Sequence, residues 1–428
     1  MENDFCIHTF KGERLLPESV QLSPDGKYVV SFASHDKTYI WELSSRNLIK
    51  TFNGLSWNVV SADGKYIAGE WTDKRTFKKN LNIFRFPDGP LISTINIEIR
   101  THYCILSIDF SPSGDYIAIF VEDMDNDREH AEIWDLKSNK IVKKLEDYNF
   151  CIISHNWTYI IFLDNENNFL IKDFWSEDLI NKIKGDTEDL WAIRTSHDEN
   201  YFIASYGEDL ETLEENPQRD MYIKVWNIKT GELVWDLKGS MFGSVSTIFS
   251  PDGNYIASGW AEGTMIVWDF QNGKQKLKWQ GHDDHISSLS FSQDGNLLAS
   301  SSYDETIKIW DFAGLIQEKQ RIEILYTEQR EKERQSELNN RKIIKRILLD
   351  YSTKFARIQV NELIEKIKIN DEDLIIDVIV EMIRNNEIYA EYFLSSKAVV
   401  FNQQANIDEI DRLMATYKEW ESKKENKK

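Results

Sequence analysis

Two short segments of the sequence carry side chains of the kinds that bind metal ions. In the segment Asp123–Glu129, carboxylates alternate with other residues as in a calcium-binding loop, but the sixth position is Arg128 instead of Gly and the twelfth is Trp134 instead of Glu. We therefore interpret this segment as a solvated acidic loop. The second segment, His282-Asp-Asp-His285, offers two imidazoles to a metal, and a different use for His282 is given below.

Other signatures of catalysis are missing from the sequence. It contains no Gly-x-Ser-x-Gly elbow, phosphate-binding loop, Gly-x-Gly-x-x-Gly or His-Glu-x-x-His motif. The three cysteines, Cys6, Cys104 and Cys151, are far apart and form no Cys-x-x-Cys pair. This argues against a disulfide scaffold or a zinc site built from cysteines and is typical of a reducing compartment. We predict a protein that is not an enzyme and has no cofactor or metal.

The distribution of charge limits which kinds of molecule, nucleic acid, membrane or protein, can be the partner. The net charge is −21, of which residues 1–313 carry −20 and residues 314–428 carry −1. An acidic body repels nucleic-acid phosphates and anionic lipid heads, which leaves a protein partner with a basic segment. The sequence has no leader-like start and no uncharged apolar stretch of about 18 residues. We expect a cytoplasmic protein without membrane insertion.

The positions above belong to a repeated unit. Variants of Ser-Pro-Asp-Gly-x-Tyr-Ile-Ala recur, and six of seven copies have Tyr five residues after the Ser. The copies begin at Ser23, Ser61, Ser111, Ser154, Ser196, Ser250 and Ser292. Pro-Asp-Gly is turn chemistry between two strands. The unit therefore predicts a hairpin that is repeated along the chain.

A second signature follows each hairpin. It is an alternating apolar strand such as IKIWDF, and its central positions are Trp41, Phe84, Trp134, Lys172, Trp226, Trp268 and Trp310. Short strands that recur every ~40–50 residues are typical of propeller blades. The fourth copy, which has Lys172 in place of Trp, is a degenerate blade.

At these residues the sequence resembles the WD-repeat β-propeller family over residues 5–313. The resemblance is strongest in the last copy, with Gly281-His282, Asp304 and Trp310-Asp311. In that family a buried His, Ser or Thr, Asp and Trp form a hydrogen-bonded tetrad. The resemblance assigns His282, Asp304 and Trp310 to it, with Ser300 or Ser302 as the hydroxyl, and Ser302 is our choice.

A ring of blades must close, because open sheet edges aggregate. The β pattern ends after Phe312, so the seventh blade lacks its outer strand. The N-terminal run Phe5–Gly12 resembles the missing strand. We predict that residues 1–313 form a seven-bladed propeller whose last blade is completed by the N-terminus.

From Gly314 the apolar period changes from 2 to about 3.6. We predict a polar helical linker over 314–342, a compact domain over 343–405 and a terminal helix over 406–428. The apolar spacing between Ile343 and Phe401 indicates three helices and a hairpin, which predicts a winged helix. The part of this segment from Arg357 to Phe401 resembles the winged-helix end of PCI domains, which occur in proteasome-lid, signalosome and translation-initiation-factor subunits. The predicted fold class is therefore mainly β, a seven-bladed β-propeller followed by a long helix and a small α+β winged-helix domain.

The terminal helix begins with a cap-like Asn406 and carries an apolar stripe that includes Ile410, Leu413 and Tyr417. The stripe either folds back on the winged helix or pairs with a partner helix. The second alternative corresponds to the helix bundles that PCI proteins form.

Three copies have a longer connection between the Tyr strand and the Trp strand, and in WD-repeat propellers this connection lies on one face. Loops on a rigid scaffold often carry function. We assign the partner-binding site to aromatic residues at the end of the strand before this connection and to the acidic loop of the fifth copy. Aromatic residues there could instead pack between blades. The assigned residues are Trp71, Tyr206, Trp260, Glu208, Asp209, Glu211, Glu214 and Glu215.

These features together predict a non-enzymatic scaffold in a hetero-complex, with the propeller binding a protein partner and the tail docking to the assembly. The alternative is a nucleic-acid-associated factor, related to translation or transcription, that uses its winged helix. The acidic candidate recognition helix, residues 370–384, makes nucleic acid an unfavourable partner.

Overall fold

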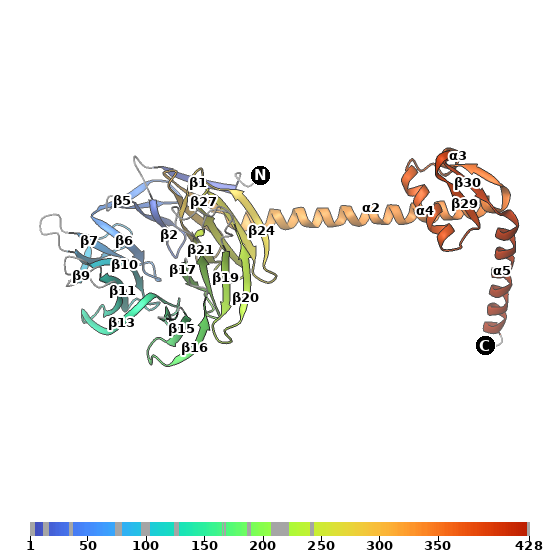
Figure 1. Ribbon diagram of the computed structural model, residues 1–428. Coiled ribbons are helices and arrows are strands. Elements are labelled where there is room, and N and C mark those ends of the chain that lie inside the picture. The colour runs from blue at the N-terminus through green and yellow to red at the C-terminus, as the bar shows by residue number, and fades with distance from the viewer. Residues whose placement is uncertain are drawn as a thin grey trace. The chain divides into compact units, whose positions relative to one another are not determined.

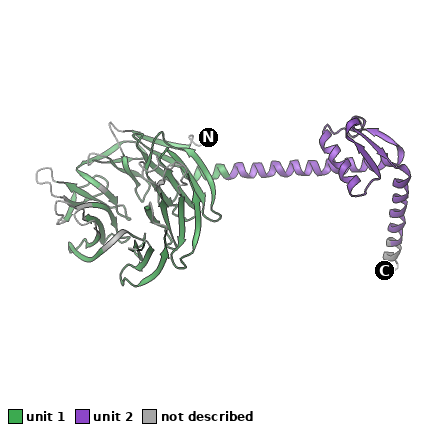
Figure 2. Ribbon diagram, viewed as in Figure 1, with its two compact units in different colours: residues 1–319 green, residues 320–428 purple. Residues whose placement is uncertain are grey.

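The computed structural model describes residues 5–11, 17–33, 37–72, 79–95, 103–123, 128–164, 166, 168–185, 190–206, 222–239 and 244–425. The chain forms two compact units, residues 1–319 and 320–428 (Figure 2). The boundary lies six residues after the end predicted for the propeller, inside a helix. The two units are described separately below.

Unit 1 is built from antiparallel sheets, which are mostly four-stranded. The first sheet contains β2 (Pro17–Leu22), β3 (Tyr28–Ala33), β4 (Lys37–Glu42) and β5 (Leu48–Asn53). The second contains β6 (Leu55–Val60), β7 (Tyr66–Thr72), β8 (Lys79–Arg85) and β9 (Leu91–Ile95). Within each sheet the strands follow chain order, as in a meander.

The third sheet has seven strands because one long strand serves two neighbouring groups. It contains β10 (Tyr103–Phe110), β11 (Tyr116–Asp123), β12 (Arg128–Asp135), β13 (Lys140–Ile153), β14 (Tyr159–Leu163), β15 (Asn168–Asp173) and β16 (Leu179–Lys184). Strand β13 pairs with β12 from Lys140 to Tyr148 and with β14 from Asn149 to Ile153. It is therefore the last strand of one four-stranded group and the first strand of the next.

The remaining sheets of unit 1 are again four-stranded. One contains β17 (Leu190–Thr195), β18 (Tyr201–Tyr206), β19 (Tyr222–Asn227) and β20 (Leu233–Lys238). The next contains β21 (Ser244–Phe249), β22 (Tyr255–Trp260), β23 (Thr264–Asp269) and β24 (Lys274–Gln280). The last contains β25 (Ile286–Phe291), β26 (Leu297–Ser302), β27 (Thr306–Asp311) and the N-terminal β1 (Cys6–Lys11).

The repeated serine explains why each copy folds as a hairpin. In all seven copies its hydroxyl accepts a hydrogen bond from the backbone N–H five residues later, at 2.9–3.1 Å. The third residue after the serine has positive φ, which Gly supplies in five copies and Trp157 and Glu199 supply in the other two. The motif thus closes the turn between the first two strands of each group.

The four-stranded groups pack against one another in chain order. Each neighbouring pair of groups shares a cluster of buried apolar side chains. The last group shares such a cluster with the first, through Phe10 and Ile307 on one side and Val20 and Val29 on the other. Over the described residues of unit 1, this closed set of contacts is consistent with a β-propeller.

The N-terminal strand completes the last sheet. β1 runs antiparallel to β27, beside which it is drawn in Figure 1. Cys6 is opposite Trp310, and Lys11 is opposite Thr306. This is the pairing expected from the sequence. The side chain of Phe10 is buried, and its ring lies 5.4 Å from that of Trp41 in the first sheet.

Unit 2 contains most of a long helix, two short helices, a small sheet and a terminal helix. The elements are α2 (Phe312–Lys354), β28 (Arg357–Gln359), α3 (Val360–Ile367), α4 (Glu372–Arg384), β29 (Ala390–Phe393), the 3₁₀ turn η2 (Leu394–Ser396), β30 (Ala398–Phe401) and α5 (Gln403–Glu425). The sheet is antiparallel in the order β28-β30-β29. Its core joins Leu348 of α2, Leu363 of α3, Val378 of α4 and Val399 of β30. None of the described helices has the length and apolar content needed to cross a bilayer.

Two element boundaries differ from the sequence prediction. Helix α2 extends to Lys354, so the segment predicted as a linker and the first helix of the compact domain are one helix. Helix α5 begins at Gln403, because Asn402 accepts the hydrogen bond from Ala405 N–H that was expected at Asn406. Asn406 is instead buried, where its amide binds both backbone polar groups of Tyr389.

Phe10→Ala tests how much the closing strand stabilises unit 1. We expect a loss of roughly 3–4 kcal/mol in the free energy of unfolding, because the variant leaves a cavity between the last and first sheets. Ile7→Ala on the same strand is the control, with an expected loss below about 1 kcal/mol because Ile7 is 39% exposed. Urea denaturation measures both, and equal effects would contradict the role assigned to β1.

Candidate functional site

A chain of hydrogen bonds runs through the last sheet, from the loop before β25 to β27. His282 Nδ1 lies 2.9 Å from Asp304 Oδ2, and His282 Nε2 lies 2.7 Å from Ser300 Oγ. Trp310 Nε1 donates to the same hydroxyl at 2.8 Å. Thr306 donates to the other carboxylate oxygen of Asp304. The structure therefore joins three of the four residues assigned to the tetrad.

The fourth assignment, Ser302, is wrong, because the hydroxyl between the imidazole and the indole belongs to Ser300. Both serines lie on one face of β26, since residues two apart in a strand share a face. Ser302 lies nearer the loop, where it donates to the backbone oxygen of Asp284 at 2.9 Å and accepts from Asp304 N–H at 3.1 Å. It therefore closes the loop beside the tetrad.

The charges of His282 and Asp304 determine which atom donates in each of these hydrogen bonds. Burial lowers the pKa of His282, more than the nearby Asp304 raises it, so the imidazole is neutral. Burial alone would raise the pKa of Asp304, but hydrogen bonds from His282 and Thr306 outweigh it and hold that pKa well below its usual range. A neutral His282 thus donates to Asp304 and accepts from Ser300.

The two histidines proposed as alternative metal ligands have different surroundings. His282 is engaged in the tetrad, whereas the ring of His285 stacks on Tyr303 at a centroid distance of 4.8 Å. Across the described residues, no three His, Cys, Asp or Glu side chains are grouped as a metal site requires. Residues 124–127 of the acidic segment lie outside that description.

The aromatic residues assigned to partner binding are mostly core. Trp260 is 0% exposed, and its Nε1 donates to Ser258 Oγ at 2.6 Å. Ser258 corresponds in the repeat to Ser300, and Trp260 corresponds to Ser302. The indole lies against Gly239, where any added Cβ would overlap it. In this sheet Trp260 therefore bonds to the serine hydroxyl that is equivalent to the one bonded by His282 in the last sheet.

The same position is also packed in two other sheets. Tyr206 is buried and stacks on Tyr222 at 4.8 Å. Trp71 is half-buried, with its ring 6.2 Å from that of Phe84. The assignment of Trp260 and Tyr206 as exposed anchors is therefore wrong, because neither side chain reaches the surface. The five acidic residues assigned with them, Glu208, Asp209, Glu211, Glu214 and Glu215, lie outside the described residues.

An exposed aromatic residue that the sequence reasoning missed lies beside the tetrad. Tyr303, in the turn between β26 and β27, is 46% exposed and rests on the ring of His285. Three exposed carboxylates lie next to these two residues in the chain, those of Asp283, Asp284 and Glu305. The signal in the sequence was a Tyr directly before the tetrad Asp, inside an acidic loop. We call Asp283, Asp284, His285, Tyr303 and Glu305 the Tyr303 surface.

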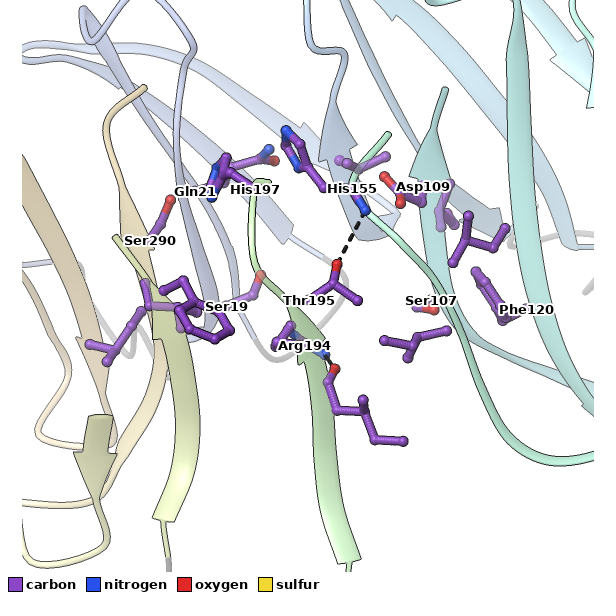
Figure 3. Close-up of a pocket in the computed structure, with 18 of the residues that line it drawn as sticks. Ser19, Gln21, Ser107, Asp109, Phe120, His155, Arg194, Thr195, His197 and Ser290 are labelled. Carbon is purple, nitrogen blue, oxygen red and sulfur yellow. Dashed lines mark hydrogen bonds between the residues drawn. The ribbon is translucent and has the colours of Figure 1, made fainter. Parts of the chain in front are cut away.

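A cavity of about 460 Å³ lies where the first strands of all the four-stranded groups meet. Figure 3 shows its side chains, with Ser19, Gln21 and Ser290 on one side and Ser107 and Asp109 on the other. His155, Arg194, Thr195 and His197 lie between them. We call this cavity the channel.

The ionisable residues of the channel come from neighbouring strands. Asp109 lies on β10, His155 follows β13, and Arg194 and His197 lie on and after β17. The two imidazole rings are 4.4 Å apart. Asp109 and Arg194 each stand two residues before the repeated serine, and His155 and His197 directly follow it. Sequence reasoning missed this group, because other residue types occupy these two positions in the remaining copies.

Burial governs the protonation of this group. It raises the pKa of Asp109 to about 7, although the charge of Arg194 opposes the shift. It lowers the pKa values of His155 and His197, and His155 lowers that of His197 further. At neutral pH Arg194 is the cationic member of the group.

Comparison with known proteins identifies WD repeats in part of the chain. The family described as "WD domain, G-beta repeat" matches residues 231–269 and 273–311. The second match contains the whole tetrad. The chain is 23% identical to Pre-mRNA-processing factor 17 of Homo sapiens over 289 residues, which are 65% of this chain and 47% of that protein. The same protein of Mus musculus gives the same values. The chain thus matches about half the length of these relatives.

Replacing each of the two serines in turn tests the corrected tetrad. Ser300→Ala leaves His282 Nε2 and Trp310 Nε1 buried without a partner, so we expect a loss of roughly 2–4 kcal/mol in the free energy of unfolding. Ser302→Ala is the matched control, with an expected loss of about 1 kcal/mol because its partners lie at the loop. Urea denaturation followed by Trp fluorescence distinguishes them, and a larger loss for Ser302→Ala would restore the original assignment.

Asp109→Asn tests the raised pKa. Between about pH 4 and 7 the folded protein keeps a proton that the unfolded chain has released, so stability falls as pH rises through this interval. The variant removes this effect. Relative to the wild type, the free energy of unfolding of the variant should rise by roughly 1–2 kcal/mol between about pH 5.5 and 8. This is less than the whole pKa shift corresponds to, because water in the channel screens the charge. Asp115→Asn, at the exposed turn after β10, should show no such gain in urea denaturation.

Proposed function

We propose that this chain is a non-enzymatic scaffold whose seven-bladed WD-repeat propeller binds a basic protein segment. The observation that carries the proposal is the Tyr303 surface. Its exposed ring lies among carboxylates, and such a ring binds Arg or Lys side chains by cation–π contact. The neutral imidazole of His285 supports the ring without adding positive charge.

The charge of residues 1–313 favours the same partner. A net charge of −20 attracts a basic segment over a distance, and its carboxylates repel nucleic-acid phosphates. The relatives that match this chain are named as a pre-mRNA-processing factor. We therefore propose that this chain acts within a hetero-complex. A cytoplasmic location stays a prediction.

For the tail we propose a winged helix that docks to the assembly. The order of α3, α4, β29 and β30, with β28 at the other edge of the sheet, supports this fold. The stripe of α5 supports a partner helix over folding back, because Leu413, Met414 and Tyr417 are each more than half exposed among the described residues. A helix bundle like that of PCI proteins is the corresponding assembly.

The alternative function, nucleic-acid binding through the tail, loses support from its ion pairs. The basic residues of α2 that could contact phosphates are Arg341, Lys342, Lys345 and Arg346. Lys342 and Arg346 are exposed, whereas the other two are ion-paired. Arg341 Nη1 and Lys345 Nζ both bind Glu381 of α4 at 2.8 Å, and Lys345 also binds Glu387. These carboxylates would compete with phosphates for the same donors.

Charge and ring variants of the Tyr303 surface test the main proposal. Tyr303→Ala and the charge reversal Glu305→Lys should each weaken capture of basic partners by the full chain at least about tenfold. Their melting temperatures should stay close to that of the wild type, because both side chains are exposed. Tyr326→Ala on α2 is the matched control, since Tyr326 is also an exposed tyrosine.

Affinity capture followed by quantitative mass spectrometry measures the loss. Equal capture by Tyr303→Ala and the control would contradict the assigned surface. Binding of RNA or DNA by the full chain at physiological salt would favour the alternative function.

A further inference from the structure

The two sides of the channel differ in chemistry. Four uncharged polar residues, Ser19, Gln21, Asn58 and Ser290, come from β2, β6 and β25. Several of them already hold neighbouring sheets together. Gln21 Oε1 accepts from Val60 N–H at 2.9 Å, and Ser290 Oγ accepts from Leu22 N–H at 3.1 Å. This side of the channel is part of the scaffold.

The ionisable side retains unused donors. Arg194 is exposed to the channel, and one of its N–H groups binds the backbone oxygen of Ile193 at 2.8 Å. Its guanidinium interacts electrostatically with Asp109 and carries five N–H donors. Nδ1 of His197 is buried and has no hydrogen-bond partner among the described residues. A buried polar atom without a partner calls for a ligand or water.

We propose that the channel binds a small oxyanion, a carboxylate or phosphate group, between Arg194 and His197. A guanidinium matches the geometry of both groups, because two parallel N–H donors meet two oxygen atoms. The hydroxyl of Thr195, between the two residues, accepts from His155 N–H at 3.2 Å and has its own proton to donate. The cavity volume suits a small molecule.

A cation fits this site less well. Among the channel residues, Asp109 supplies the single carboxylate, and no three His, Cys, Asp or Glu side chains of the described residues are grouped as a metal site requires. The guanidinium of Arg194 would repel such an ion. The remaining acids near the histidines, Asp198 and Glu199, already bind Ser196 and the backbone of Asn156.

The site predicts a definite pH dependence. An ionised Asp109 repels an oxyanion at Arg194, and it becomes neutral as pH falls through about 7. The histidines gain charge only at lower pH, because burial lowers their pKa values. Asp198 and Glu199 attract those protons in the same direction. All of these changes strengthen oxyanion binding as the pH falls.

Calorimetric titration of the full chain with two probe anions tests the proposal. Sulfate represents a phosphate group and acetate a carboxylate, because neither probe changes its charge between pH 6 and 8. We expect saturable binding of at least one probe that is about fivefold or more tighter at pH 6 than at pH 8. Sodium chloride at matched ionic strength should give no saturable heat, and the probe that binds identifies the chemical class.

Variants separate the site from general charge effects. Arg194→Gln should weaken binding at least about tenfold, whereas Arg46→Gln, at an exposed turn outside the channel, should leave it unchanged. Asp109→Asn should give at pH 8 the affinity that the wild type shows at pH 6. This variant decides the question if Arg194→Gln fails to fold.

Two results would overturn the proposal. One is the absence of saturable binding of both probes at millimolar concentration. The other is binding that is equal in the wild type and in Asp109→Asn at both pH values. Neither result bears on the Tyr303 surface, which lies at a turn outside the channel.

Discussion

The structure of unit 1 depends on burying both faces of every four-stranded group. Each group carries apolar side chains on two faces, and a neighbouring group is the surface available to cover each of them. A row of such sheets would leave two uncovered faces, so the row has to become a ring. The contact of the last sheet with the first, through Phe10 of β1 and Val20 of β2, removes those two faces. The channel and the Tyr303 surface exist because this ring holds strands from distant parts of the chain together.

The tetrad and its replacement by Trp260 show how one packing problem is solved in two ways. In the last sheet a small Ser at position 302 leaves room for His282, which bonds to Ser300. In the preceding sheet the residue at the equivalent of position 302 is Trp260, and its indole reaches the equivalent hydroxyl directly. Both arrangements satisfy a buried serine with a ring nitrogen. The two copies thus differ in which ring bonds to the serine, whereas the position of the serine in the sheet is the same.

Much of the fold could be predicted because the signals are local and repeated. The serine-anchored turns, the alternating strands and the N-terminal strand each depend on a few adjacent residues. The exposure of an aromatic side chain could not be predicted from such local signals. Trp260 and Tyr303 are both aromatic residues near loops, and their burial depends on whether a glycine such as Gly239 makes room in the neighbouring sheet. Ser300 and Ser302 could not be separated either, because residues two apart share a strand face. The channel residues Asp109 and Arg194 are not repeated in the other copies of the unit, and they come together only because the sheets form a ring.

The pairing of β1 with β27 has a consequence for synthesis. Cys6 and Trp310 are opposite each other but roughly 300 residues apart in the chain. At translation rates of about 5–20 residues per second, the first strand leaves the ribosome about 15–60 s before its partner exists. Contacts of such long range also form slowly, because the entropy of closing the loop must be overcome first. During that interval the backbone N–H and C=O groups of β1 have no partner strand on the nascent chain. A chaperone or a neighbouring polypeptide therefore has time to bind this segment before the ring closes.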